Sequence, residues 1–266
     1  MIFFDQLNRQ IEINYPPKRI ISLVPSQTEL LFDLGFMDEV IGITKFCVHP
    51  KEWFRTKTRV GGTKKIDLKK IIGLKPDLII GNKEENDKFQ MEELMEHFPV
   101  WVSDIKNLDR AINMINSIGE LTDKKEKAIE ITKKIIDQFG NLASRPGNFN
   151  NDNKKVAYFI WKNPYIIAGK NTFINDMLVR CGLNNVFNDM EKRYPEISSD
   201  ELQKAKPEII MLSSEPYPFG EKHIAEIQKI CPFAKIVLTD GEMFSWYGSR
   251  LLKATEYFCN LNNKLF

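Results

Sequence analysis

The residues best suited to chemistry in this sequence are aromatic and polar side chains that directly follow short apolar segments. Aromatic rings offer flat stacking surfaces, and a few polar groups among them orient a bound molecule, which is the usual makeup of a small-molecule site. Each aromatic residue taken alone could equally be a packing residue, so the prediction depends on their grouping. The candidate ligand-binding residues are Ser26, Phe46, His49, Lys83, Trp161, Tyr217, Asp240, Phe244, Trp246, Tyr247 and Arg250.

Catalytic and metal-binding patterns are missing from the sequence, so we predict neither catalytic residues nor a metal site. The sequence contains no Gly-x-Gly-x-x-Gly, no Gly-x-x-x-x-Gly-Lys-Ser/Thr and no Gly-x-Ser-x-Gly. Its three histidines, at positions 49, 97 and 223, include no pair at the spacing of metal ligands. Cys47 and His49 stay open as a pair of ligands, whereas the wide spacing of the four cysteines favours free thiols.

Composition limits the classes of protein to consider. The chain has 266 residues, 42% hydrophobic and 28% charged, as in ordinary globular proteins. Its formal charge of +2 lacks the basic excess typical of nucleic-acid binding, so we expect no nucleic-acid partner. No segment reaches the ~20 apolar residues of a membrane span, so we expect no membrane insertion. Residues 1–14 lack the pattern of a signal peptide, which indicates a cytoplasmic chain or a removed signal.

Strands and helices alternate in the first half of the sequence. Ser26 stands three residues before Glu29, the spacing of a capping box, and predicts a helix that begins at Gln27. Asp67 is suited to cap a second helix. The predicted strands cover 19–24, 40–44, 78–80 and 100–102, and the predicted helices cover 27–34, 68–74 and 89–98. This alternation favours a mainly parallel sheet.

A long helix is predicted in the middle of the chain. Apolar residues recur at helical spacing from Leu108 to Leu142, with Thr122-Asp123-Lys124 as a possible interruption. A polar connector rich in Gly, Pro and Asn follows over 144–153. Alternation of strands and helices then resumes. The predicted strands cover 156–161, 209–212 and 235–238, and the predicted helices cover 171–181, 224–230 and 249–261. A further short helix is predicted after the capping box of Ser198 and Glu201.

Two segments of the sequence resemble each other. Residues 68–80 align without gaps on residues 199–211, and both read as helix, Lys-Pro, acidic residue and buried strand. Chance similarity between βα units is the alternative to an internal repeat. We predict an α/β protein with two Rossmann-like lobes, 1–107 and 146–266, joined by a single backbone helix over 108–145. Ligands bind at the carboxyl ends of such strands, so we expect a cleft between the lobes.

Several segments resemble the class III periplasmic binding proteins, the helical-backbone metal receptors of ABC importers, with the vitamin B12-binding branch closest. The resemblance rests on Pro17–Gly35, Val60-Gly-Gly62, Leu74-Lys-Pro-Asp-Leu-Ile-Ile80, Ala168-Gly169 and Ala205-Lys-Pro-Glu-Ile-Ile210, in matching order from about residue 17 to the C-terminus. It implies two Rossmann-like lobes on one long helix, with little hinge closure.

The resemblance also implies roles for particular residues. Phe46, Trp161, Tyr194 and the segment 240–246 match ligand contacts of corrinoid-binding members. Asp200 or Glu201 matches the acidic residue by which the second lobe docks on a transporter, and Lys69 stands at the corresponding position of the first lobe.

We therefore expect a monomeric substrate-binding protein without an intrinsic cofactor. It would capture a metal chelate, namely a corrinoid such as cobalamin, haem or a ferric siderophore, for an ABC importer. The family resemblance implies a periplasmic or cell-envelope location. The alternatives are a cytoplasmic sensor or scaffold of the same fold and, third, an enzyme on a two-lobed α/β frame.

Overall fold

The computed structural model describes residues 1–144 and 154–265, which form two compact units. The first unit comprises Met1–Ile105, Asp109–Ile135 and Trp246–Arg250. The second comprises the described residues of Lys106–Leu108, Ile136–Ser245 and Leu251–Phe266. None of the helices within the described residues is long and apolar enough to cross a membrane.

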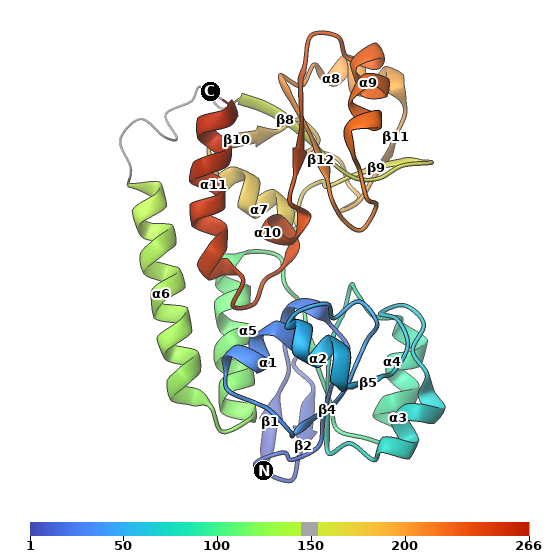
Figure 1. The fold of residues 1–266 in the computed structure, drawn as a ribbon, viewed down its shortest axis with the longest axis vertical. Coiled ribbons are helices and arrows are strands. Elements are labelled where there is room, and N and C mark those ends of the chain that lie inside the picture. The colour runs from blue at the N-terminus through green and yellow to red at the C-terminus, as the bar shows by residue number, and fades with distance from the viewer. Residues whose placement is uncertain (145–153, 266) are drawn as a thin grey trace. The chain divides into compact units, whose positions relative to one another are not determined.

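A five-stranded parallel sheet forms the centre of the first unit (Figure 1). Its strand order is β5 (Thr58–Arg59), β4 (Val40–Ile43), β3 (Ile20–Ser22), β6 (Leu78–Asn82) and β7 (Val100–Ser103). Every residue of β3, β6 and β7 is buried, as expected for parallel strands covered on both faces. The helices are α1 (Pro25–Asp33), α2 (Lys51–Thr56), α3 (Leu68–Leu74) and α4 (Lys88–Met95), and a hairpin of β1 (Ile2–Phe4) and β2 (Gln10–Glu12) precedes them.

The second unit is built around a six-stranded, mainly parallel sheet. Its order is β11 (Glu196–Ile197), β9 (Tyr165–Ile167), β8 (Lys154–Trp161), β12 (Ile209–Ser213) and β13 (Lys235–Thr239), with β10 (Leu183–Asn185) also paired to β8. The strands β9 and β11 are antiparallel to their neighbours. The helices are α7 (Phe173–Arg180), α8 (Ser199–Ala205), α9 (Glu221–Ile230), α10 (Gly241–Ser245) and α11 (Leu251–Leu265).

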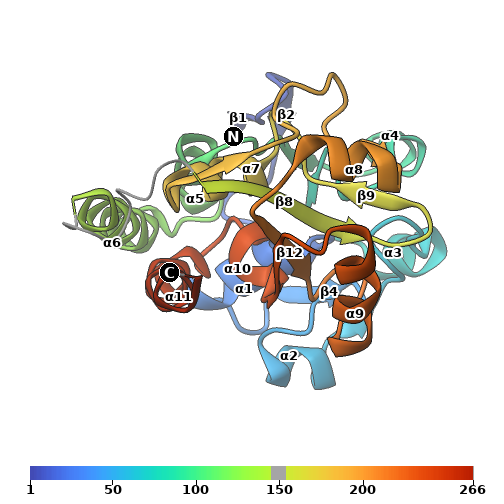
Figure 2. The ribbon, with the colours of Figure 1, turned by 90° about the horizontal axis from the view of Figure 1, so that it is seen from above.

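Alternating side chains of β8 separate the two faces of this sheet. Ala157 and Phe159 pack with α8 and α9 on one face, where Leu202 and Ile227 complete the core. Tyr158 points to the opposite face, where α7, α10 and α11 lie (Figure 2). The predicted α/β class with mainly parallel sheets is therefore confirmed, and each unit has helices on both sides of its sheet.

The two aligned segments adopt the same local structure. Asp67 and Ser198 cap α3 and α8 through hydrogen bonds from the backbone N–H three residues on, as predicted. Each helix ends at a lysine in the left-handed conformation, with φ of 46° at Lys75 and 47° at Lys206. The following proline cannot continue a helix, and the chain then enters β6 or β12. The internal similarity is thus a repeated helix–turn–strand unit.

The central stretch is not the single helix predicted, whereas the possible interruption at Thr122-Asp123-Lys124 is confirmed. The stretch predicted as one helix over 108–145 contains two, α5 (Leu108–Leu121) and α6 (Lys125–Ala143). Asp123 between them has φ of 59°, which ends the right-handed helix. The hydroxyl of Thr132 in α6 donates to Oδ1 of Asn116 in α5 at 3.2 Å, so the two helices pack side by side. The 19-residue helix α6 has residues in both units, as does α5, whose first residue, Leu108, belongs to the second.

The start of α1 is a second correction. The helix begins at Pro25 with Val24 as N-cap, and no side chain caps it. Proline is favoured at the first helical position because its fixed φ suits the helix and it has no N–H to satisfy. The predicted capping box of Ser26 and Glu29 is therefore wrong.

Of the polar connector over 144–153, residues 145–153 lie outside the described residues, so the predicted lobe boundaries at 107 and 146 stay a prediction.

The packing of α5 against α6 predicts a large effect of a small substitution. A Cβ on Gly119 would lie 2.3 Å from the Cβ of Ala128, closer than carbon atoms can approach. We expect Gly119→Ala to lower the free energy of unfolding by about 1–3 kcal/mol, measured by urea denaturation. The control is Gly140→Ala in α6, where no atom lies within 4 Å of the added Cβ. That change should raise stability by about 0.5–1 kcal/mol through helix propensity, and equal effects of the two substitutions would contradict the packing.

Candidate functional site

The five residues Trp246–Arg250 belong to the first unit, although α10 before them and α11 after them belong to the second. The sequence analysis grouped all residues after β13 together in the second lobe. The structure divides that group, because Asp240 and Phe244 lie in the second unit while Trp246, Tyr247 and Arg250 lie in the first. The contacts of this segment therefore define the candidate site of the first unit.

Arg250 and Glu29 form a buried, bidentate ion pair. The Nε and Nη2 atoms of Arg250 each donate to a different carboxylate oxygen of Glu29 at 2.8 Å. Both residues are 6% exposed, so little water competes with the pair. Two parallel hydrogen bonds to a carboxylate are among the strongest that a side chain makes, and they fix the orientation of both partners. This pair holds the segment against α1.

Trp246 lies between a cation and an imidazole. The guanidinium of Arg250 lies 4.7 Å from the centre of the Trp246 ring, and the His49 ring meets the same indole edge-on at 5.6 Å. The structure thus brings three predicted ligand-binding residues together. Trp246 is 6% exposed, and its ring is already occupied by these neighbours.

Tyr247 and Gly248 bring the segment close to the loop after β6 and to α1. The Tyr247 hydroxyl donates to the carboxylate of Glu85, and burial, followed by this negative neighbour, raises the pKa of Tyr247 well above its usual value. A Cβ on Gly248 would lie 2.5 Å from the carbonyl oxygen of Ser26, so only glycine permits this approach. Ser26 itself is buried in the first turn of α1.

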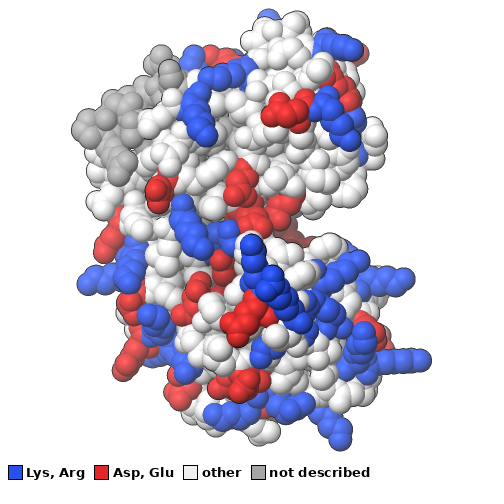
Figure 3. Space-filling view, in the orientation of Figure 1, with Lys and Arg blue, Asp and Glu red and all other residues white. Residues whose placement is uncertain are grey.

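Phe46 and Lys83 lie on loops at the carboxyl ends of β4 and β6. Phe46 is 50% exposed, and the ammonium of Lys45 lies 5.0 Å from its ring centre. Lys83 is exposed, and its Nζ lies 3.4 Å from the carboxylate of Asp104. Figure 3 shows Lys and Arg side chains gathered on the part of the first unit that carries α2, β5 and α4.

Trp161 and Tyr217 are paired in the second unit. Trp161, at the end of β8, is 39% exposed and meets Tyr217 edge-on at 5.6 Å. The hydroxyl of Tyr217 lies 3.3 Å from Nε2 of His223, whose Nδ1 accepts a hydrogen bond from the N–H of Gly220 at 2.9 Å. His223 is buried, so this network fixes the loop that carries Tyr217. Tyr194, on the loop before β11, is 36% exposed.

A shallow depression of about 550 Å³ lies at the carboxyl ends of β12 and β13. The N–H of Asp240 donates to the hydroxyl of Tyr257 at 2.8 Å, and the Asp240 carboxylate accepts from the N–H of Glu242 at 3.0 Å. The depression is therefore acidic, and Asp240 is the one predicted ligand-binding residue among those that line it: Ser214, Glu215, Leu238, Thr239, Asp240, Glu242 and Tyr257.

Phe244 is a correction to the predicted set. It is 0% exposed and packs against Tyr158 at 5.1 Å and Phe258 at 4.8 Å between ring centres. These contacts belong to the core beneath the sheet of the second unit. The aromatic pattern could not separate this core residue from its exposed counterparts, because burial depends on the position of α11.

The two predicted docking residues differ in their surroundings. Glu201 completes the capping box with Ser198, and the hydrogen bonds that the N–H and the hydroxyl of Ser198 donate to its carboxylate lower the pKa of that group. Asp200 is exposed in the first turn of α8. Lys69 is exposed at the corresponding place on α3. Asp200 is thus the better placed of the two acidic residues to meet a partner.

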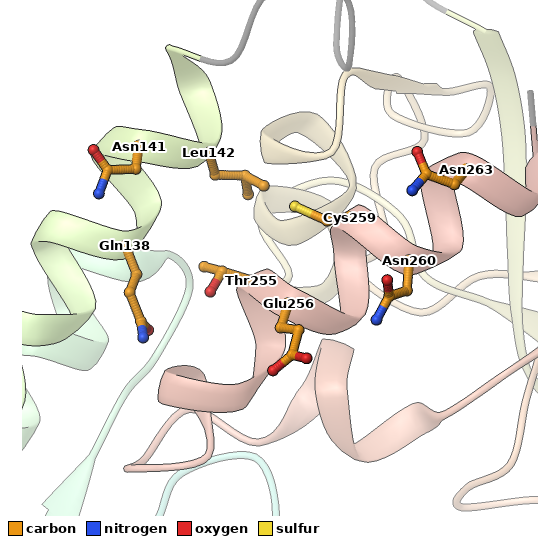
Figure 4. A pocket seen from close by; sticks show the side chains of 8 residues that line it. All are labelled: Gln138, Asn141, Leu142, Thr255, Glu256, Cys259, Asn260 and Asn263. Atoms are coloured by element: carbon orange, nitrogen blue, oxygen red, sulfur yellow. The ribbon is translucent and has the colours of Figure 1, made fainter.

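A further pocket, of about 360 Å³, lies between α6 and α11 in the second unit (Figure 4). Carboxamides from both helices, among them Gln138 and Asn260, line it together with the Cys259 thiol and the Glu256 carboxylate. No predicted ligand-binding residue takes part. Within residues 1–144 and 154–265, the structure contains no cluster of three or more His, Cys, Asp or Glu suited to hold a metal ion.

The fold comprises two α/β units, each built on a mainly parallel sheet, and known binding proteins are similar to it in sequence and structure. The vitamin B12-binding protein of Pectobacterium carotovorum is 24% identical over 248 residues, covering 92% of this chain and 88% of that protein. An ABC transporter substrate-binding lipoprotein of Bacillus subtilis is 26% identical over 213 residues, covering 78% of this chain and 67% of that protein. The structure of the periplasmic vitamin B12 binding protein BtuF of Vibrio cholerae is similar with a TM-score of 0.78 at 23% identity, covering 94% of this chain and 98% of that one.

A family model described as periplasmic binding protein matches residues 20–229, which is most of the chain. The chain therefore belongs to the periplasmic binding protein family, and the resemblance seen in the sequence is confirmed. The cleft predicted between two lobes stays a prediction, as do the ligand contacts within each unit.

Sequence reasoning missed the residues that hold the Trp246–Arg250 segment in place. Glu29 was assigned to a helix cap, and neither Glu85 nor Asp33, which accepts from the Ser249 hydroxyl, was singled out for this role. The hydrogen bond from Ser249 to Asp33 spans 216 residues of sequence, and that between Tyr247 and Glu85 spans 162. No local pattern encodes such pairs.

The buried pair gives a stability prediction. Replacing Arg250 by Met leaves the carboxylate of Glu29 buried without its cation, and we expect the free energy of unfolding to fall by about 3–5 kcal/mol. The double variant Glu29→Leu/Arg250→Met removes both charges and should recover a large part of this loss. As a control, Lys134→Met removes an exposed partner of Glu130 and should change urea denaturation little. If Arg250→Met denatured at the same urea concentration as the parent protein, the ion pair would not hold the segment.

Proposed function

We propose that this protein captures a metal chelate, namely a corrinoid, haem or a ferric siderophore, and delivers it to an ABC importer. The observation that carries the proposal is the pair of exposed aromatic side chains at the carboxyl ends of parallel strands. Phe46 is 50% exposed in the first unit, and Trp161 is 39% exposed in the second. Large aromatic residues are normally buried, so their exposure at the ligand-binding edge of each sheet favours stacking on a bulky, flat ligand.

The relatives support a transport role. They are named as a vitamin B12-binding protein and as a substrate-binding lipoprotein of an ABC transporter. By analogy we propose a location in the cell envelope, a monomeric state and no nucleic-acid partner. The ligand would be the cargo, and the protein would carry no cofactor of its own.

The arrangement of the polar residues favours binding over catalysis. The imidazole of His223 is buried and joined to Gly220 and Tyr217, which leaves it a structural role in the loop. The His49 ring packs against Trp246. A general base needs access to substrate within hydrogen-bond distance, together with a nucleophile or water that it can activate. We therefore propose a binding protein that is not an enzyme.

Fluorescence titration tests the ligand-binding role. We expect cyanocobalamin, haemin or a ferric siderophore to quench the tryptophan fluorescence of the protein saturably. Trp161→Leu should weaken the binding about 10-fold, because a stacking surface is lost. The control is Phe233→Leu, since Phe233 is also exposed but precedes β13 and so lies at the opposite edge of the sheet. Failure of every chelate to bind the parent protein would refute the proposed function.

Delivery to a transporter depends on α8 in this proposal. We expect Asp200→Arg to reduce chelate uptake about 10-fold in vesicles that contain the cognate permease and ATPase, because the exposed carboxylate becomes a positive charge. Chelate affinity should stay unchanged. Asp137→Arg on the exposed side of α6 is the matched control and should transport normally. Normal uptake by the Asp200 variant would exclude this residue from docking.

A further inference from the structure

Four lysines stand on the loops that follow β4, β5 and β6 in the first unit. We call Lys45, Lys64, Lys65 and Lys83 the lysine rim, and all four side chains are exposed. These loops are at the carboxyl ends of parallel strands, the edge where open α/β sheets bind ligands.

Hydrogen bonds join the three loops into one surface. The N–H of Lys45 donates to the carbonyl of Gly61 at 2.8 Å, which links the loops after β4 and β5. The Lys64 ammonium donates to the backbone carbonyl of Glu84, and the Asn86 side chain donates to the carbonyl of Thr63 at 3.1 Å. The loop after β5 therefore reaches the loop after β6, and the rim lysines share one rigid support.

Packing also positions Phe46 within this surface. A Cβ on Gly62 would lie 3.2 Å from the Phe46 ring and 3.3 Å from Cε of Lys45, so both side chains lie against the backbone of the neighbouring loop. The Lys45 ammonium lies 5.0 Å from the centre of the exposed Phe46 ring. The surface thus offers a flat apolar face with a positive charge beside it.

The rim contains more lysines than ion-pair partners among the described residues. Lys83 pairs with the buried carboxylate of Asp104, whereas none of the described carboxylates forms an ion pair with Lys45, Lys64 or Lys65. The Lys64 ammonium donates to the backbone carbonyls of Glu84 and Asn86.

Carboxylates are also present on these loops. Glu85 accepts a hydrogen bond from the hydroxyl of Tyr247, and the neighbouring Glu84 is half-buried.

The exposed ammonium groups of the lysine rim carry like charges and repel one another. An anion bound among them would reduce that repulsion.

We propose that the lysine rim binds anionic groups of the chelate, so that the preferred substrate is a negatively charged metal chelate with carboxylate or catecholate groups. This inference rests on the proposed function and narrows it. A neutral corrinoid would leave the ammonium groups unmatched. The depression of the second unit contains Glu215, Asp240 and Glu242, so the anionic groups are assigned to the first unit only.

The test compares chelates of different charge on matched variants. The probes are the iron(III) tris-catecholate complex of 2,3-dihydroxybenzoate and haemin as anions, and cyanocobalamin and ferrioxamine as chelates without net negative charge. The rim variant is Lys45→Gln/Lys64→Gln/Lys65→Gln, which spares Lys83 and its buried partner. The control variant, Lys133→Gln/Lys222→Gln/Lys229→Gln, removes the same charge at exposed helix positions. Circular dichroism and urea denaturation verify that both variants fold.

We expect the parent and the control variant to bind an anionic chelate with equal affinity, and the rim variant to bind it about 10-fold more weakly. Raising the salt concentration should weaken binding to the parent more than to the rim variant. If the rim and control variants bound the anionic chelate equally well, the proposed role of the lysine rim would be overturned. Stronger binding of cyanocobalamin or ferrioxamine than of the anionic chelates by the parent protein would overturn it as well. The proposed function would stand in both cases. Absence of binding by every chelate would overturn both proposals.

Discussion

Removing a guanidinium from water is unfavourable unless a carboxylate and well-placed hydrogen bonds replace its hydration. In this protein the buried guanidinium is that of Arg250. Arg250 belongs to the first unit, although the helices before and after its segment belong to the second. The two oxygens of Glu29 meet its guanidinium in a planar fork, and this geometry fixes the direction of the chain at that point. Trp246 and Tyr247 then take their places against His49 and Glu85. The ion pair, together with the hydrogen bonds of Tyr247 and Ser249, joins this segment to the first unit.

The two units present different surfaces at the carboxyl ends of their parallel strands. Parallel strands bring the loops that follow them to a common edge, which explains why both groups of candidate residues collect there. The first unit carries the exposed ring of Phe46 and the lysine rim. The second carries Trp161 and an acidic depression that includes Asp240. A shared fold thus supports two surfaces of unlike charge.

The predictions that the structure corrects failed for a common reason, because each depended on which residues are neighbours in space. The apolar spacing continues from α5 into α6 because each helix buries one face, so periodicity alone does not reveal that Asp123 reverses the chain between them. The spacing of Ser26 and Glu29 fits a capping box, but the carboxylate of Glu29 is instead the partner of the buried Arg250 guanidinium. Phe244 has the same residue type as Phe46, and only the position of α11 makes it a core residue.

By itself the sequence determined what depends on local order: the strands β3, β4, β6, β7, β8, β12 and β13, the caps at Asp67 and Ser198, the repeated Lys-Pro turn and the membership of a binding-protein family. These features follow from dihedral preferences and from hydrogen bonds between residues close in sequence. Tertiary structure alone decided that the central stretch is a helical hairpin and that Trp246–Arg250 joins the first unit. The physical reason is that packing depends on which residues meet in space. The hairpin depends on the close contact of Gly119 with Ala128, and the segment depends on charged and polar partners more than a hundred residues away.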